Sequence, residues 1–108
     1  SGLVLAATLA ADNQALVFAA TWDGAAQELV VTRTAGAAAE AGRVHELWLI
    51  ADDGEPVPLG LIAGDALRAP LAALPEGAVL AVSLEPAGGS PTGAPTGPVL
   101  VTGVVTRL

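Results

Sequence analysis

The chain has 108 residues, of which 53% are hydrophobic and 14% charged, and a formal charge of −7 at pH 7. Eleven carboxylates against four arginines repel polyanions, which argues against nucleic acid and anionic membrane surfaces as partners. With no cysteine, the chain has no disulfides, no thiolate zinc site and no cysteine nucleophile.

The length and the low share of charged residues predict one folded domain over residues 1–108. Short apolar runs alternate with turn residues at intervals of about 8 to 12 residues, the spacing typical of antiparallel β-sandwiches and barrels. The predicted strands cover residues 3–11, 15–22, 28–34, 44–50, 59–63, 67–71, 79–85 and 99–106. The sequence therefore predicts an all-β sandwich of about eight strands.

The first half of the chain shows the two-residue period of half-buried strands. Residues 15–22 place Leu16, Phe18, Ala20 and Trp22 on one face. The Ala-rich segment 35–42 is too short for a stable helix, and we expect a loop there with at most one helical turn.

The second half begins with a run, residues 44–50, that is apolar on both faces and so favours a position inside a sheet. Two prolines, Pro56 and Pro58, precede residues 59–63 and indicate an edge strand. Residues 79–85 alternate cleanly, with Leu80, Val82 and Leu84 predicted to point inward. Residues 86–98, here called the Pro-Gly tract, hold four of the eight prolines and cannot form a regular element.

The opening run, residues 2–11, is uncharged but only about half as long as the ~20 residues of a membrane helix. It also lacks the basic region of a signal peptide. The chain starts with Ser1, so we expect it to be a fragment of a longer protein.

Two sequence blocks resemble a known family. The first is HELWLI at residues 45–50, followed by Asp53-Gly54 and by PVPLG at residues 56–60. The second is AVSLEPAGGSP at residues 81–91, followed by PTGPV at residues 95–99. Both resemble motifs of the C-terminal domain of anti-sigma-K (RskA) factors. The motif residues are His45, Glu46, Leu47, Trp48, Leu49, Ile50, Gly60, Glu85, Pro86, Gly88, Gly89, Ser90, Pro91, Pro95, Thr96, Gly97 and Pro98.

The resemblance implies an extracytoplasmic regulatory domain with no catalytic residue and no cofactor. It further implies an N-terminal cytoplasmic segment, absent here, that sequesters an extracytoplasmic-function sigma factor, and one membrane helix between the two. Site-1-type and intramembrane proteases would then release the sigma factor. The same resemblance places the domain on the extracytoplasmic (periplasmic) side. Exposed strand edges would permit a homodimer without requiring one.

Two groups of residues invite a chemical interpretation. The sequence Asp52-Asp53-Gly54-Glu55 could be a calcium loop, but it lacks the alternating acidic pattern, so we favour a solvated turn. His45 is the single histidine, which excludes a pair of histidine ligands, and no G-x-S-x-G motif accompanies it. We expect a partly exposed, structural histidine and predict no catalytic, metal or cofactor site.

Glu85 and Trp48 carry structural hypotheses. Glu85 directly precedes Pro86 and the glycine turn at residues 88–89, whose backbone N–H groups a carboxylate can bind. We therefore expect Glu85 to pin the Pro-Gly tract. Trp48 is predicted to pack in the core. As the alternative function, we consider a free-standing periplasmic or secreted module that binds a small ligand at the tract or between sheets.

Overall fold

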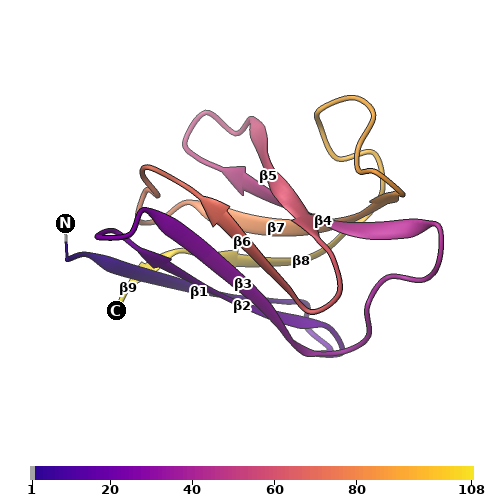
Figure 1. Cartoon of the computed structure of the whole chain (residues 1–108), viewed down its shortest axis with the longest axis horizontal. Helices are drawn as coiled ribbons and strands as arrows, with labels where there is room; N and C mark the ends of the chain where they lie inside the picture. The colour runs from indigo at the N-terminus through magenta and orange to yellow at the C-terminus, as the bar shows by residue number, and fades with distance from the viewer. Residues whose placement is uncertain (1) are drawn as a thin grey trace.

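The computed structural model describes residues 2–108 and contains a single antiparallel sheet (Figure 1). Its strand order is β5-β4-β7-β8-β1-β2-β3-β6, with β9 paired to β1. The strands are β1 (Val4–Ala10), β2 (Val17–Asp23), β3 (Glu28–Ala35), β4 (Arg43–Ile50), β5 (Pro56–Ile62), β6 (Ala66–Pro70), β7 (Val79–Pro86), β8 (Val99–Val104) and β9 (Thr106–Arg107).

The all-β antiparallel fold is confirmed, with three differences of detail. The last predicted strand is divided at Val105, whose backbone pairs with Gly77 and Ala78, so residues 2–108 contain nine strands. The fifth begins at Pro56 because β5 is an end strand that pairs only with β4, where proline is tolerated. Residues 35–42 contain no helical turn.

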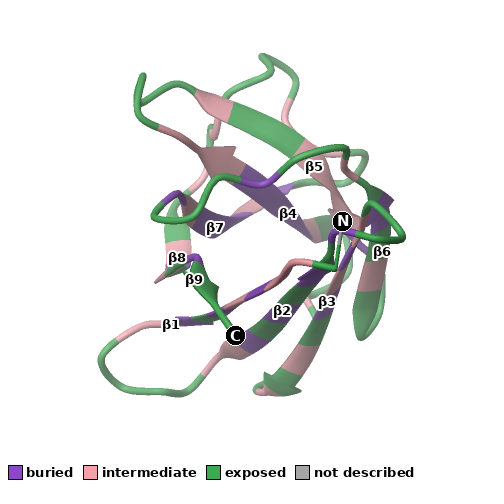
Figure 2. Cartoon of the chain, turned by 90° about the vertical axis from the view of Figure 1, so that its left-hand side faces the viewer, coloured by how far each residue is buried: buried purple, intermediate pink, exposed green. Residues whose placement is uncertain are grey.

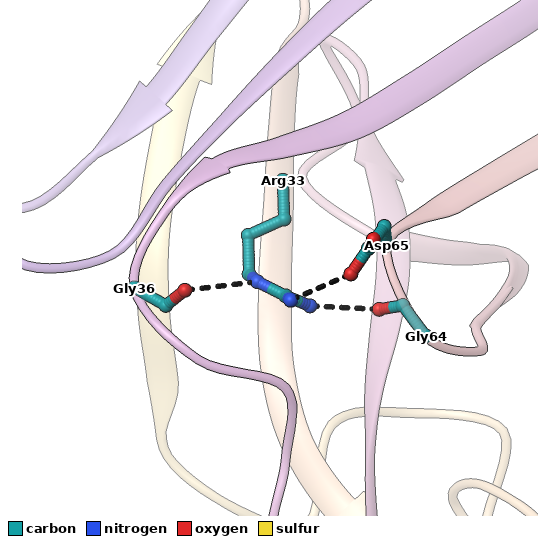
Figure 3. A network of polar contacts seen from close by, with 4 residues as sticks. All are labelled: Arg33, Gly36, Gly64 and Asp65. Atoms are coloured by element: carbon teal, nitrogen blue, oxygen red, sulfur yellow. Dashed lines mark hydrogen bonds and ion pairs between the residues drawn. The ribbon is translucent and has the colours of Figure 1, made fainter.

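The sheet curls until its two end strands meet. β5 turns directly into β6, and Ala63 forms a bridge with Ala66. Arg33, on β3, fixes this corner (Figure 3): it donates to the carbonyl oxygens of Gly36 and Gly64 at 3.1 and 2.7 Å and to Asp65 Oδ1 at 2.7 Å. Its side chain is only 13% exposed. The guanidinium therefore joins three segments and nearly closes the sheet into a barrel.

The interior follows the predicted alternation. Phe18, Ala20 and Trp22 are buried, and Leu16 packs against them. Leu80 and Val82 are also buried in the core, while Leu84 is half-buried. Figure 2 shows the contrast between β2, where burial alternates, and β4 and β7, where consecutive residues are buried. β4 and β7 are thus covered on both faces.

The two ends of the barrel are formed by different parts of the chain. The start of β1 and the C-terminal residue lie at one end, on the left in Figure 1, where the Leu108 N–H donates to the carbonyl of Val4 at 3.1 Å. The Pro-Gly tract, which links β7 to β8, lies at the opposite end. No helix within residues 2–108 is long and apolar enough to cross a membrane.

Candidate functional site

A second buried layer lies outside the barrel core, on the outer face of β4 and β7. Glu46 pairs with Ser83 across the two strands, and Val44 pairs with Glu85. Because side chains alternate along a strand, these residues point away from the core that holds Leu47. Glu46, Ser83 and Glu85 are nonetheless 7%, 0% and 0% exposed. The outer face is therefore covered, and polar groups of the Pro-Gly tract contact it.

Glu85 ties the far end of the tract to β7. Its carboxylate accepts hydrogen bonds from the Thr96 hydroxyl at 2.5 Å, the Thr96 N–H at 3.2 Å and the Gly97 N–H at 3.3 Å. The Ser83 hydroxyl donates to Glu85 Oε2 at 2.5 Å from the same strand. One buried carboxylate thus gathers donors from β7 and from residues 96–97.

The electrostatics of Glu85 follow from these donors. Burial alone raises the pKa of Glu85, because it disfavours the charged form. Hydrogen bonds from the side chains of Ser83 and Thr96 and from the backbone of Gly97 and Thr96 outweigh burial, and the pKa lies below its ordinary value. Glu85 is therefore an anion at neutral pH, and the donors that hold it within residues 2–108 are neutral hydroxyl and backbone N–H groups.

Glu46 holds the near end of the tract. Its Oε1 accepts the backbone N–H of Ser90 at 2.7 Å. Gly89, at φ +94°, passes so close that an added Cβ would lie 2.9 Å from a methyl carbon of Leu61 and 3.2 Å from Glu46 Oε1. Glycine is required there by both conformation and space. The two carboxylates thus anchor the tract at two points.

Trp48 supports this arrangement from below. Its indole Nε1 donates to Ser83 Oγ at 2.8 Å, and the ring is completely buried. The hydrogen bonds run from Trp48 through the Ser83 hydroxyl to Glu85 and then to the tract. Within residues 2–108, no buried side-chain nitrogen or oxygen is left without a partner. Such satisfied networks make a local structure rigid.

The tract is also ordered within itself. Ser90 Oγ donates to the carbonyl of Ala94 at 2.5 Å, and the Thr92 N–H donates to Ser90 Oγ at 3.2 Å. Gly97 passes over β7 so closely that a Cβ would lie 1.7 Å from the Leu84 carbonyl oxygen. The exposed crest of the tract carries no charge. It is a fixed, uncharged loop surface.

The structure brings the two family-like blocks together, although about thirty residues separate them in sequence. Glu46 of the first block accepts the backbone N–H of Ser90 in the second. Trp48 of the first block donates to Ser83 in the second, and the Ser83 hydroxyl donates in turn to Glu85. The other motif residues have different positions. Leu47 is in the core, Leu49 and Ile50 are partly buried on β4, and Pro86, Gly88, Pro91 and Pro98 are exposed while Pro95 is half-buried.

Gly60 has a purely local role. It lies in a β-bulge of β5 opposite Leu47, with φ +148°, and a Cβ would come within 3.2 Å of Leu67. A backbone angle in this range favours glycine. The motif glycine at this position is therefore explained by the bulge.

Sequence reasoning placed Glu85 correctly as an anchor of the tract but assigned it the wrong partners. Glu85 binds residues 96–97, whereas the N–H beside the glycine turn, that of Ser90, goes to Glu46. The roles of Glu46 and Ser83 were missed. The available signal was a glutamate inside an otherwise apolar strand, which is rarely buried unless it has a partner. Trp48 is buried as predicted, but outside the main core.

His45 lies on the other face of β4, pointing into the barrel. It is 4% exposed, more buried than predicted, and its ring meets Phe18 edge-on with centroids 5.5 Å apart. Burial, and then the nearby charge of Arg33, lower the pKa of His45. Because Ser83 points to the opposite face, these two side chains do not form a catalytic pair.

Two further features of the surface could be considered as sites, an acidic turn and a groove. The turn at residues 51–55 is exposed, and Asp53 Oδ1 accepts the backbone N–H of Glu55 at 3.0 Å, an ordinary turn contact. A shallow groove of about 290 Å³ lies between Ala10–Asp12 and the segment 99–102. Its side chains are small or aliphatic except for Asp12 and Thr102. Neither feature gathers several polar groups on one point, as a ligand site does.

A family model matches most of the chain. The model of the family described as anti-sigma-K factor RskA, C-terminal, matches residues 2–99. The chain belongs to this family. The RskA C-terminal match covers every strand up to the start of β8 and includes both anchors of the tract. No curated protein and no solved structure matches the chain.

Membership of the RskA C-terminal family makes the chain a domain of the anti-sigma-factor type, with a sigma factor as the partner of that class of protein. Among residues 2–108, no group of three or more histidine, aspartate or glutamate side chains is placed to hold a metal ion. The docked Pro-Gly tract, a fixed and uncharged loop surface, is the candidate site.

Proposed function

We propose that this chain is the extracytoplasmic regulatory domain of a membrane-anchored anti-sigma factor and controls release of a sigma factor by regulated proteolysis. The family match over residues 2–99 carries the proposal. The buried residues Glu46, Ser83 and Glu85 hold the Pro-Gly tract in place, which is a structural role compatible with a regulatory domain. In this scheme the sigma factor binds a cytoplasmic segment upstream of residue 1, and the proteases act on the full-length protein.

The geometry suggests how the domain would be oriented relative to the membrane. β1 is the first strand of the domain, so an upstream membrane helix would join the barrel at the end where β1 starts. The Pro-Gly tract would then lie at the end farthest from the membrane. The principal-axis extents of the domain are 39 × 28 × 24 Å. A rigid tract at that end would be presented to soluble extracytoplasmic partners.

A homodimer through strand edges remains a prediction. The end strands β5 and β6 lie next to each other at the 63–66 turn, and β5 carries Pro56 and Pro58, which have no N–H to donate. Proline on an edge strand opposes pairing with another chain.

Location and partner are tested together in the native bacterium. The full-length protein is tagged within the turn at residues 51–55, which is exposed, and intact cells are treated with an external protease. We expect the tag to be removed from intact cells, and the remaining protein to co-purify with a sigma factor. A tag that is protected in intact cells but cut in lysed cells contradicts the proposed location. Absence of a sigma factor from the purified protein contradicts the proposed partner.

A further inference from the structure

Two polar side chains, Arg33 and His45, face the inside of the barrel. On β3, Val31 belongs to the core, and Arg33 follows it on the same face by the two-residue period. Arg33 pairs across β2 with Phe18, which is completely buried. On β4, His45 lies two residues before the core residue Leu47, and its ring meets the Phe18 ring at 5.5 Å. One aromatic ring therefore brings the imidazole to the level of the guanidinium.

Arg33 holds the corner at which the sheet closes. Its side chain binds Gly36, Gly64 and Asp65, as Figure 3 shows, and its backbone N–H donates to the Asp65 carbonyl at 2.7 Å. The guanidinium is thus an interior group, and its ion-pair partner Asp65 has a side chain that is 79% exposed. An exposed carboxylate offsets the charge of Arg33 only in part, because water screens it.

His45 is buried next to this charge and has no counterion. It is 4% exposed, and within residues 2–108 it forms no ion pair. No other charged group of the elements packed around it faces the imidazole. Glu46 and Glu85 lie on the outer face and bind the Pro-Gly tract, Asp23 and Glu28 lie at the opposite ends of β2 and β3, and Glu40, Arg43 and Arg68 are exposed. A proton on His45 would meet only the repulsion of Arg33.

We propose that His45 is a proton sensor that controls closure of the barrel: a proton on its imidazole places a second positive charge beside Arg33 and favours an open corner at residues 63–66. Burial first, and then the charge of Arg33, keep the pKa of His45 in the closed form below its ordinary value of 6.5. In an open corner water reaches the ring and the ordinary pKa applies. As pH falls through 6.5, the closed form therefore loses stability relative to the open form, and the loss is complete below the lowered pKa.

The corner is connected to the Pro-Gly tract through the end of β5. Ile62 pairs with His45, and its neighbour Leu61 pairs with Glu46. Leu61 lies against the tract, since an added Cβ at Gly89 would be 2.9 Å from its methyl carbon. Opening of the corner would therefore displace a residue on which the tract rests.

The regulatory meaning of this connection rests on the proposed function. A domain outside the cytoplasm is exposed to the external pH, and acidification would loosen the corner and the support of the tract together. The sensor itself is a property of the folded chain. Its test needs no sigma factor and no membrane, so its failure is distinct from failure of the proposed function.

The experiment uses the purified 108-residue chain and two kinds of variant. His45→Gln and His45→Phe remove the titrating group, and Arg33→Gln removes the repelling charge. Because the chain has one histidine, an NMR titration of the ring protons gives the pKa of His45 directly. Amide hydrogen exchange at pH 7.5 and 5.5, corrected for the intrinsic pH dependence of exchange, follows residues 61–67 at the corner and residues 19–21 of β2 as a reference.

We expect the pKa of His45 to lie below 6.5 in the parent and to rise in Arg33→Gln. One group changes an equilibrium at most about tenfold per pH unit, and pH 5.5 is one unit below the ordinary value. The opening equilibrium at residues 61–67 should therefore increase about three- to tenfold between pH 7.5 and 5.5 in the parent. It should stay constant in both His45 variants, and residues 19–21 should stay constant in every form.

Four results would overturn the proposal. The first is a pKa of 6.5 or higher for His45 in the parent, and the second is an unchanged pKa in Arg33→Gln. The third is a corner that opens equally at both pH values in the parent, or equally with pH in the parent and the His45 variants. The fourth is equal acceleration at residues 61–67 and 19–21, which would mean global unfolding. If His45→Gln does not fold, His45→Phe, which keeps a ring beside Phe18, serves in its place.

Discussion

Replacing Glu85 by alanine should unfasten the Pro-Gly tract and lower the stability of the whole domain. Four donor groups lose their acceptor: the hydroxyls of Ser83 and Thr96 and the backbone N–H groups of Thr96 and Gly97. Hydrogen bonds to a charged group contribute about 1.5 to 3 kcal/mol each, but a detached tract regains water and no carboxylate remains to be desolvated. Because a buried donor left without its acceptor costs about 1 to 3 kcal/mol, and the detached tract recovers part of this loss from water, we expect a loss near 3 kcal/mol.

A domain of this length has a free energy of unfolding of about 5 to 15 kcal/mol, so the Glu85→Ala variant should still fold. Urea unfolding followed by tryptophan fluorescence gives the loss of stability, and the melting temperature should fall by about 10–20 °C. Glu85→Gln keeps the shape of the side chain but places an NH₂ group among other donors. Its free energy of unfolding should lie between those of the parent and Glu85→Ala. Glu55→Ala removes the same charge from an exposed turn and should change stability by less than about 0.5 kcal/mol. A Glu85→Ala variant as stable as Glu55→Ala would refute the anchoring role.

The other predictions concern the same layer and the barrel corner. Gly97→Ala should destabilise more than Gly88→Ala in chemical unfolding, because the first places a Cβ against a backbone carbonyl whereas the second has open space and only a strained φ of about +90°. Trp48→Phe should cost about 2 kcal/mol through a lost hydrogen bond and a smaller ring, and a variant with parent stability would contradict the network. Arg33→Lys should lower the melting temperature measurably, since an ammonium cannot reach three acceptors in a fork. Because the folded-state pKa of Glu85 is lowered, its contribution to stability is complete above the ordinary glutamate value of about 4.3 and is lost as pH falls through the lowered value. The free energies of unfolding of the parent and of Glu85→Ala, measured as a function of pH, should therefore converge at low pH. A constant difference between them down to low pH would contradict the lowered pKa.

Most of the fold could be predicted because it depends on local alternation. The two-residue period predicts which side chains point inward in residues 15–22 and 79–85, and most of these side chains are buried or half-buried in the structure. The division of the last strand at Val105 could not be predicted, because it depends on the connector at residues 77–78 taking the backbone of Val105 away from β1. That competition between two non-local partners leaves no trace in the local pattern.

The sequence predicts part of the candidate site. Glu85 before a Pro-Gly tract indicates an anchor, but which N–H groups it binds depends on how twelve loop residues fold back over β7. Glu46 looks like an exposed position of β4, since only a covering loop turns that outer face into an interior. The near-continuous burial of β4 is therefore a non-local property: the apolar pattern predicted two covered faces without showing that one cover is the tract.

The most direct test of the regulatory role compares two forms of the full-length protein in its native bacterium. One is complete, and in the other residues 1–108 are replaced by an unrelated β-domain of similar size. Transcription from promoters of the partner sigma factor is measured together with the amount of intact protein on immunoblots. The proposed control by this domain predicts that the replacement changes both readouts, so that transcription no longer follows the inducing signal. Unchanged, signal-dependent transcription and the same cleavage in both forms would contradict it.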